Sequence, residues 1–85
     1  MGEYSKALSF YDKTREIFEK TLSANHPDLA TSYSNLGFLY KNMKEYSKAH
    51  SYLVRALDIL RVSLPPNHPR LEDVKQSIEV VKEEL

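Results

Sequence analysis

Three histidines titrate near neutral pH, so they are the first candidates for metal binding or acid–base chemistry. They are His26, His50 and His68. His26 and His68 each stand in the same tripeptide, Asn-His-Pro. A polar residue directly before proline is typical of a helix start, where side chains cap free backbone N–H groups. We therefore interpret His26 and His68 as structural residues and His50 as a partly exposed surface residue.

The other residue types offer little catalytic chemistry. The 85 residues include no cysteine, which removes thiolate metal ligands, thiol nucleophiles and disulfides together. Serines are frequent, but the sequence has no Gly-x-Ser-x-Gly motif, glycine-rich phosphate loop or His-Glu-x-x-His motif. The sequence therefore predicts a protein that is not an enzyme and that binds no cofactor or metal.

Charge and aromatic content narrow the class of partner. Twelve Lys and Arg residues balance twelve Asp and Glu residues, so no net field draws the chain to nucleic acid. The six tyrosines recur mostly at helical spacing, which favours a core over base stacking. No apolar run approaches the ~20 residues of a membrane span. We expect protein or peptide partners, no nucleic acid, no membrane and, without cysteine or a targeting segment, a cytoplasmic location.

An internal repeat sets the elements that must position these residues. A shift of 42 positions aligns Glu3–Ala7 with Glu45–Ala49 and Asn25–Pro27 with Asn67–Pro69. Within each unit the apolar residues recur every three or four positions, as on a helix with one face against a core. The expected fold is all-α in a single domain, with helices over roughly 3–21, 27–42, 45–62 and 69–84.

Proline and loop length explain how these helices begin and connect. Pro27 and Pro69 suit the first helical position, where a backbone N–H has no partner and the fixed φ is already helical. Only Met43 and Lys44 remain between the second and third helices. A connection this short makes the two helices antiparallel neighbours, so the unit is a helical hairpin.

Large and small residues alternate along the second and third helices. The pattern is carried by Tyr33, Leu36, Gly37, Tyr40, Tyr46, Ala49, Ala56 and Leu57. This spacing resembles the tetratricopeptide repeat, and the 42-residue period with Asn-His-Pro resembles the long repeats of kinesin light chains. The resemblance implies antiparallel hairpins stacked in a right-handed α-solenoid. Gly37 and Ala49 also have a physical reason, because helices approach to ~8 Å only where side chains are small.

Departures from the family pattern divide the chain. In the last helix, charged residues stand where the second helix has two tyrosines and a glycine; they are Lys75, Glu79 and Lys82. We therefore expect the last helix to be a polar cap that faces solvent. Lys44 stands where the family has glycine, and a left-handed backbone there would cost about 1 kcal/mol. The first segment lacks its partner helix, which suggests a fragment or an engineered chain. The expected segments are a truncated repeat, a complete repeat and a cap, at 3–24, 25–66 and 67–85.

The first candidate binding surface is the concave face, which in tetratricopeptide proteins is lined mainly by the first helix of each hairpin. The residues of 27–42 that lie off the main core stripe are Thr31, Ser34, Asn35, Phe38, Lys41 and Asn42. Asn35 matches a family position whose amide holds a bound peptide backbone, because an amide both donates and accepts hydrogen bonds. An ordinary solvated side chain is an equal alternative for Asn35.

The second candidate surface is the apolar face of the first helix, which has no partner helix before it. Exposed apolar faces mark interfaces, and exchange of identical elements is a common route to dimers. The residues expected to form this face are Tyr4, Ala7, Leu8, Tyr11 and Phe18. We expect a protein-interaction scaffold that self-associates through this face as a homo-oligomer, with a peptide-binding adaptor as the alternative.

Overall fold

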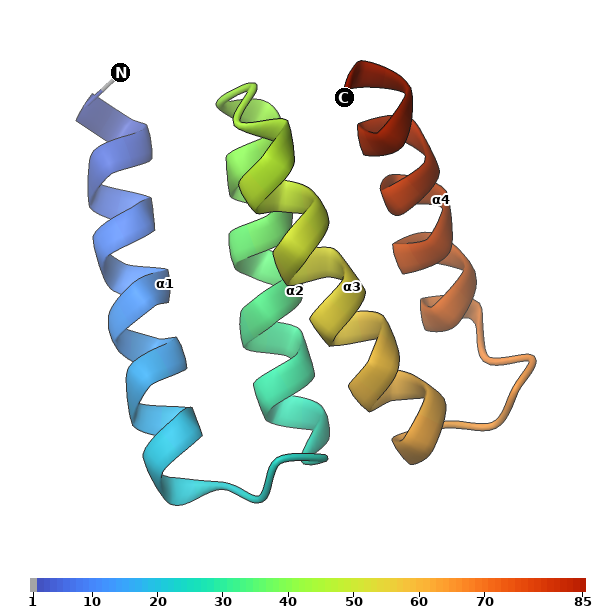
Figure 1. The fold of residues 1–85 in the computed structure, drawn as a ribbon. Helices are drawn as coiled ribbons and strands as arrows, with labels where there is room; N and C mark the ends of the chain where they lie inside the picture. The colour runs from blue at the N-terminus through green and yellow to red at the C-terminus, as the bar shows by residue number, and fades with distance from the viewer. Residues whose placement is uncertain (1) are drawn as a thin grey trace.

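The computed structural model describes residues 2–85, and Met1 lies outside the described residues. Its four helices are α1 (Gly2–Thr21), α2 (Pro27–Asn42), α3 (Tyr46–Ser63) and α4 (Pro69–Glu84). Each helix packs against its sequence neighbours and runs antiparallel to them, and α2 also contacts α4 (Figure 1). The expected all-α hairpin fold is confirmed, with every helix end within one residue of the expected one. None of the four described helices combines the length and apolar character of a membrane span.

Histidine caps begin α2 and α4. The Nδ1 atom of His26 accepts a hydrogen bond of 3.0 Å from the backbone N–H of Asp28. The Nδ1 atom of His68 accepts one of 3.1 Å from the backbone N–H of Arg70. Each histidine has an extended backbone and is followed by proline, so it satisfies an N–H group that the first helical turn leaves free. The capping role predicted for the repeated tripeptide is confirmed.

The turn between α2 and α3 depends on a left-handed residue. Lys44 has a φ of 65°, and its backbone N–H donates to the carbonyl of Lys41 at 3.0 Å. The next N–H, from Glu45, reaches back to the carbonyl of Tyr40 at 2.9 Å. These bonds end α2 and reverse the chain within three residues, but they place a lysine in a conformation that favours glycine.

Close helix contact between α2 and α3 forms the centre of the core. A Cβ atom placed on Gly37 would lie 2.6 Å from the Cγ atom of Leu53, so α3 leaves no room for a side chain there. Ala49 and Ala56 are fully buried on the α3 side of the same contact. The fully buried large side chains come from α2, α3 and α4 and are Leu36, Leu53, Leu60, Val74 and Val81.

Helix α1 is attached less deeply than the other three. Between Glu3 and Thr21 no side chain is buried, whereas α3 buries six residues. Phe18 is half-buried and packs against the core cluster, and Leu22, just beyond the helix, is also half-buried. One face of α1 therefore lies on α2, while the opposite face is free.

Candidate protein-binding surfaces

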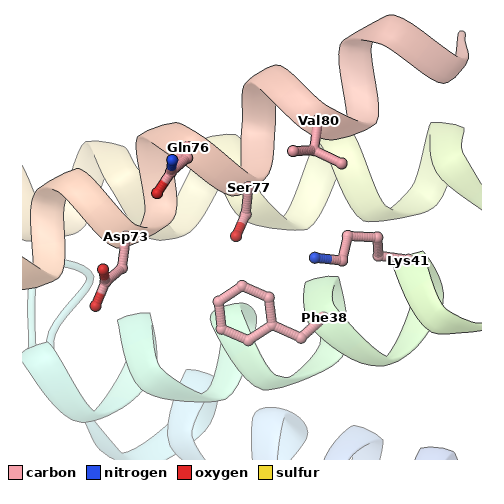
Figure 2. A pocket seen from close by; sticks show the side chains of 6 residues that line it. All are labelled: Phe38, Lys41, Asp73, Gln76, Ser77 and Val80. Atoms are coloured by element: carbon pink, nitrogen blue, oxygen red, sulfur yellow. The ribbon is translucent and has the colours of Figure 1, made fainter.

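Two hollows flank Phe38 on the face of the molecule formed by α2 with α4 on one side and α1 on the other, here called the concave face. The first hollow lies between α2 and α4, and Figure 2 shows side chains from both helices turned toward it. Its lining residues are Phe38, Lys41, Asp73, Gln76, Ser77 and Val80. The hollow combines one cation, one anion, an amide and a hydroxyl with two apolar side chains. This mixture suits a peptide, which presents both backbone amides and side chains.

The second hollow lies between α1 and α2 and shares Phe38 with the first. Its lining residues are Glu3, Tyr4, Ala7, Tyr11, Asn35, Phe38, Leu39 and Asn42. Asn35 is half-buried here, so its amide is accessible at the wall of the hollow. Phe38 thus stands as a ridge between two recesses, and a chain crossing it would contact both.

The structure separates the six residues predicted for this face. Asn35, Phe38, Lys41 and Asn42 line the hollows, and the Nζ atom of Lys41 lies 6.0 Å from the ring centroid of Phe38. The Thr31 hydroxyl is already engaged, because it donates to a backbone carbonyl at 3.2 Å and accepts a bond from the guanidinium of Arg70. Thr31 therefore holds α4 against α2 and is not free for a ligand.

The prediction that Ser34 faces a ligand is wrong. Ser34 is only 4% exposed, and its Oγ atom has no hydrogen-bond partner within the described chain. The reason is helical geometry, since Ser34 lies one turn from Ala30 and from Gly37, and both are buried. Ser34 therefore belongs to the buried side of α2.

The outward face of α1 also differs from its prediction. Phe18 packs on the core cluster, and Tyr4, Ala7 and Tyr11 line the hollow beside α2, so these residues are not the free face. Leu8 is half-buried. The prediction followed the longest apolar stripe, but that stripe is the one that docks α1 onto α2.

The large apolar side chains that do face away are Phe10 and Ile17, which are 66% and 57% exposed. Neither residue was among those predicted for this face. The internal repeat could have identified them, because a shift of 42 positions aligns Phe10 with Tyr52 and Ile17 with Ile59 of α3. Ile59 is 7% exposed and Tyr52 packs against the core, so the corresponding face of α3 is covered.

A network of charged groups joins α1 to α2. The guanidinium of Arg15 pairs with Asp12 at 2.9 Å and Glu19 at 2.7 Å, and the Tyr33 hydroxyl donates to Glu19 at 2.6 Å. Burial disfavours the charge on Arg15, but its bonds with the two carboxylates raise its pKa above the ordinary value. The hydrogen bond from Tyr33, helped by Arg15, lowers the pKa of Glu19. The spacing of three and four positions around Arg15 could have predicted the ion pairs, although not the link to Tyr33.

Within residues 2–85, no group of His, Asp and Glu side chains is arranged to hold a metal ion. Burial raises the pKa of Tyr33, with a further contribution from its hydrogen bond to Glu19, so this phenol stays protonated near neutral pH. Polar contacts here join helices to one another.

Comparison with known protein families identifies the family of the chain. A tetratricopeptide repeat family model matches residues 1–61, which include α1, α2 and most of α3. A search of curated proteins found no match. The match covers well over half of the 85 residues and agrees with the observed helical hairpins. The chain belongs to the tetratricopeptide repeat family.

Proposed function

We propose that this chain is a protein-interaction module that binds an extended peptide segment across Phe38 on the concave face. Membership of the tetratricopeptide repeat family implies an interaction or scaffold role. The observation that carries the finer proposal is that Phe38 lines both hollows, one bounded by α1 and the other by α4. In this role the chain binds a partner and does not transform it.

The side chains around Phe38 define the chemistry of the peptide. Asn35 supplies a half-buried amide that pairs with a peptide backbone group. Lys41 and Asp73 face the same hollow with opposite charges, so the peptide is not selected for a strong net charge. Val80 is 46% exposed there and offers apolar contact. We expect a peptide with at least one apolar side chain beside Phe38.

A peptide library tests this proposal. Peptides selected on the immobilised chain should lose at least about tenfold in affinity on Phe38→Ala, since truncating a buried aromatic anchor commonly costs more than 1 kcal/mol. Asn35→Ala should weaken them by a smaller factor. Val62→Ala is the matched control, because Val62 is 69% exposed and lies on α3, outside the lining of both hollows.

The variants must be shown to fold, because Phe38 also packs against the core cluster. Thermal unfolding of each variant provides this check. Selection of no peptide would reject the proposal. Selected peptides that bind the folded Phe38→Ala and Asn35→Ala variants as tightly as the original chain would reject it equally.

Self-association through α1 is a second candidate function. It is favoured by the exposure of Phe10 and Ile17, which are large apolar side chains on one free helix face. Light-scattering chromatography over a wide concentration range should then show a dimer, and Phe10→Ala with Ile17→Ala should return it to a monomer. A monomer at every concentration would reject this candidate.

The division of the chain at 3–24, 25–66 and 67–85 stays part of the proposal, with α4 as a polar cap. Its support is that Glu79 and Lys82 of α4 are exposed where α2 carries Gly37 and Tyr40.

A further inference from the structure

The free face of α1 carries a stripe of four residues, here called the outward stripe, which are Phe10, Thr14, Ile17 and Thr21. We propose that the outward stripe binds an α-helix with the side-chain pattern of α2, supplied by a protein partner. That pattern is two aromatic residues seven positions apart with glycine or alanine between them. The proposal rests on the interaction role of the family but concerns a surface distinct from the hollows beside Phe38.

The internal repeat supplies the template for this contact. A shift of 42 positions takes Phe10 onto Tyr52 and Ile17 onto Ile59. The ring of Tyr52 stacks on that of Tyr40 of α2, with centroids 5.7 Å apart and planes 6° apart. Ile59 is 7% exposed, whereas Ile17 is 57% exposed. Side chains of closely similar type are thus covered in α3 and bare in α1, and helix α2 supplies the ring that stacks on Tyr52.

Two cations beside the covered face of α3 identify the partner more closely. The Nζ atom of Lys48 lies 5.5 Å from the ring centroid of Tyr40, and the guanidinium carbon of Arg55 lies 5.8 Å from that of Tyr33. Tyr33 and Tyr40 are seven positions apart, so both rings lie on one side of α2. Cations at this distance from an aromatic ring are attracted to its face.

Helix α1 carries matching cations, and among residues 2–85 no ring is found above them. The 42-position shift takes Lys6 onto Lys48 and Lys13 onto Arg55. Both side chains are exposed, and Lys20 continues the row one heptad further along the helix. The row lies beside the outward stripe. A partner helix with two aromatic residues seven positions apart would place a ring over Lys6 and another over Lys13.

Charge also favours such a helix over a second copy of α1. Two α1 helices packed antiparallel about a two-fold axis would bring the same edge of each against the other. The rows of Lys6, Lys13 and Lys20 would then face each other. Like charges at such a contact are unfavourable, while aromatic faces are not.

The partner also needs a small residue where α2 has glycine. In the template a side chain on Gly37 would meet Leu53 of α3, so the two helices approach closely only because this residue is small. Helix α4 lacks the side-chain pattern that the partner needs, because it has Glu79 at the glycine position and Lys75 and Lys82 at the tyrosine positions. Those lysines would lie over the lysines of α1.

Two synthetic peptides test the proposal against the full chain. One has the sequence of residues 25–44 and the other the sequence of residues 67–85, the matched control with the same repeat position. Each is titrated into isotope-labelled chain and followed by amide NMR shifts, up to about 1 mM. We expect the first peptide to bind at least about tenfold more tightly than the second, with shifts centred on Phe10, Thr14 and Ile17.

Variants locate the contact. The double variant Phe10→Ala, Ile17→Ala should fold, because both side chains are exposed, and should weaken binding of the first peptide at least about tenfold. Lys13→Glu should weaken it by a smaller factor. Val62→Ala should leave it unchanged, because Val62 is 69% exposed on α3 and lies outside both surfaces. The effect of Phe38→Ala on library peptides tests the concave-face proposal separately.

Several outcomes would overturn the inference. These are equal binding of the two peptides, no binding of the first peptide, and shifts confined to the concave face. A dimer of the chain alone that disappears in the Phe10→Ala, Ile17→Ala variant would also overturn it, since a second copy would then occupy the outward stripe.

Discussion

Replacing Lys44 by glycine should stabilise the fold. Lys44 has a φ of 65°, a region in which a residue with a Cβ atom is about 1–2 kcal/mol less stable than in the ordinary helical region. Glycine avoids most of that cost because it adopts positive φ freely. The substitution also gives the unfolded chain more freedom, which offsets about 0.5–1 kcal/mol of the gain. The net increase in the free energy of unfolding should be about 0.5–1 kcal/mol.

The turn geometry makes this position suitable for the test. The side chain of Lys44 is exposed, and the hydrogen bonds that close the turn come from backbone N–H groups. Glycine keeps the bond from residue 44 to the Lys41 carbonyl, so the change isolates the backbone conformation. For a domain of this size, the expected gain corresponds to a rise of roughly 2–6 °C in Tm.

Thermal unfolding followed by circular dichroism, with urea unfolding as a second measure, provides the assay. Lys44→Ala is the control for loss of the side chain, because alanine retains the Cβ atom that is unfavourable at positive φ. It should be no more stable than the original chain. An unchanged or lower Tm for Lys44→Gly would refute the reasoning, as would an equal gain from Lys44→Ala.

Three further perturbations test the packing and the charged network. Gly37→Ala should destabilise the fold by about 1–2 kcal/mol, because the new Cβ atom would lie 2.6 Å from the Cγ atom of Leu53. The cost of this clash exceeds the gain from alanine's better helix propensity. A higher urea midpoint for the variant would contradict this. Ser32→Val should stabilise the fold by about 1 kcal/mol, because the buried Ser32 Oγ has no hydrogen-bond partner in the described chain. The equivalent position of the next repeat unit, 42 residues on, is Val74, so valine suits this environment. A loss of stability would contradict this expectation. The hydrogen bond from Tyr33 lowers the pKa of Glu19, so the stabilising contribution of ionised Glu19 is complete above its ordinary pKa and is lost as the pH falls through the lower folded-state pKa. Glu19→Gln should therefore reduce the loss of unfolding stability on acidification below about pH 5, and an unaltered acid dependence would argue against this.

The helices and their order could be predicted from the sequence because they depend on local rules that act at single positions. Pro27 and Pro69 begin helices, the repeated histidines cap them, and Lys44 takes the left-handed turn that the family pattern gives to glycine. The periodic apolar residues then leave few ways to pack four short helices. Nothing in these rules requires knowledge of distant contacts.

The candidate surfaces were harder to predict, because a face is defined by what covers it. Ser34 is polar and lies off the main apolar stripe, yet it is buried, one turn from the buried Ala30 and Gly37. Phe18 belongs to the strongest apolar stripe of α1, and that is why it docks on α2 and leaves Phe10 and Ile17 outside. Comparison of the two repeat units, position by position, would have identified the outward stripe.

Helix α1 links the two proposed surfaces. Tyr4, Ala7 and Tyr11 form one wall of the hollow beside Phe38, while Phe10 and Ile17 are exposed on the same helix, outside that lining. Because no side chain between Glu3 and Thr21 is buried, α1 has fewer apolar contacts than α3 to hold it in place. A helix bound on the outward stripe would stabilise α1 in its docked position, and the wall of the peptide hollow with it. Binding at either surface should therefore favour binding at the other, by the free energy needed to hold α1 docked.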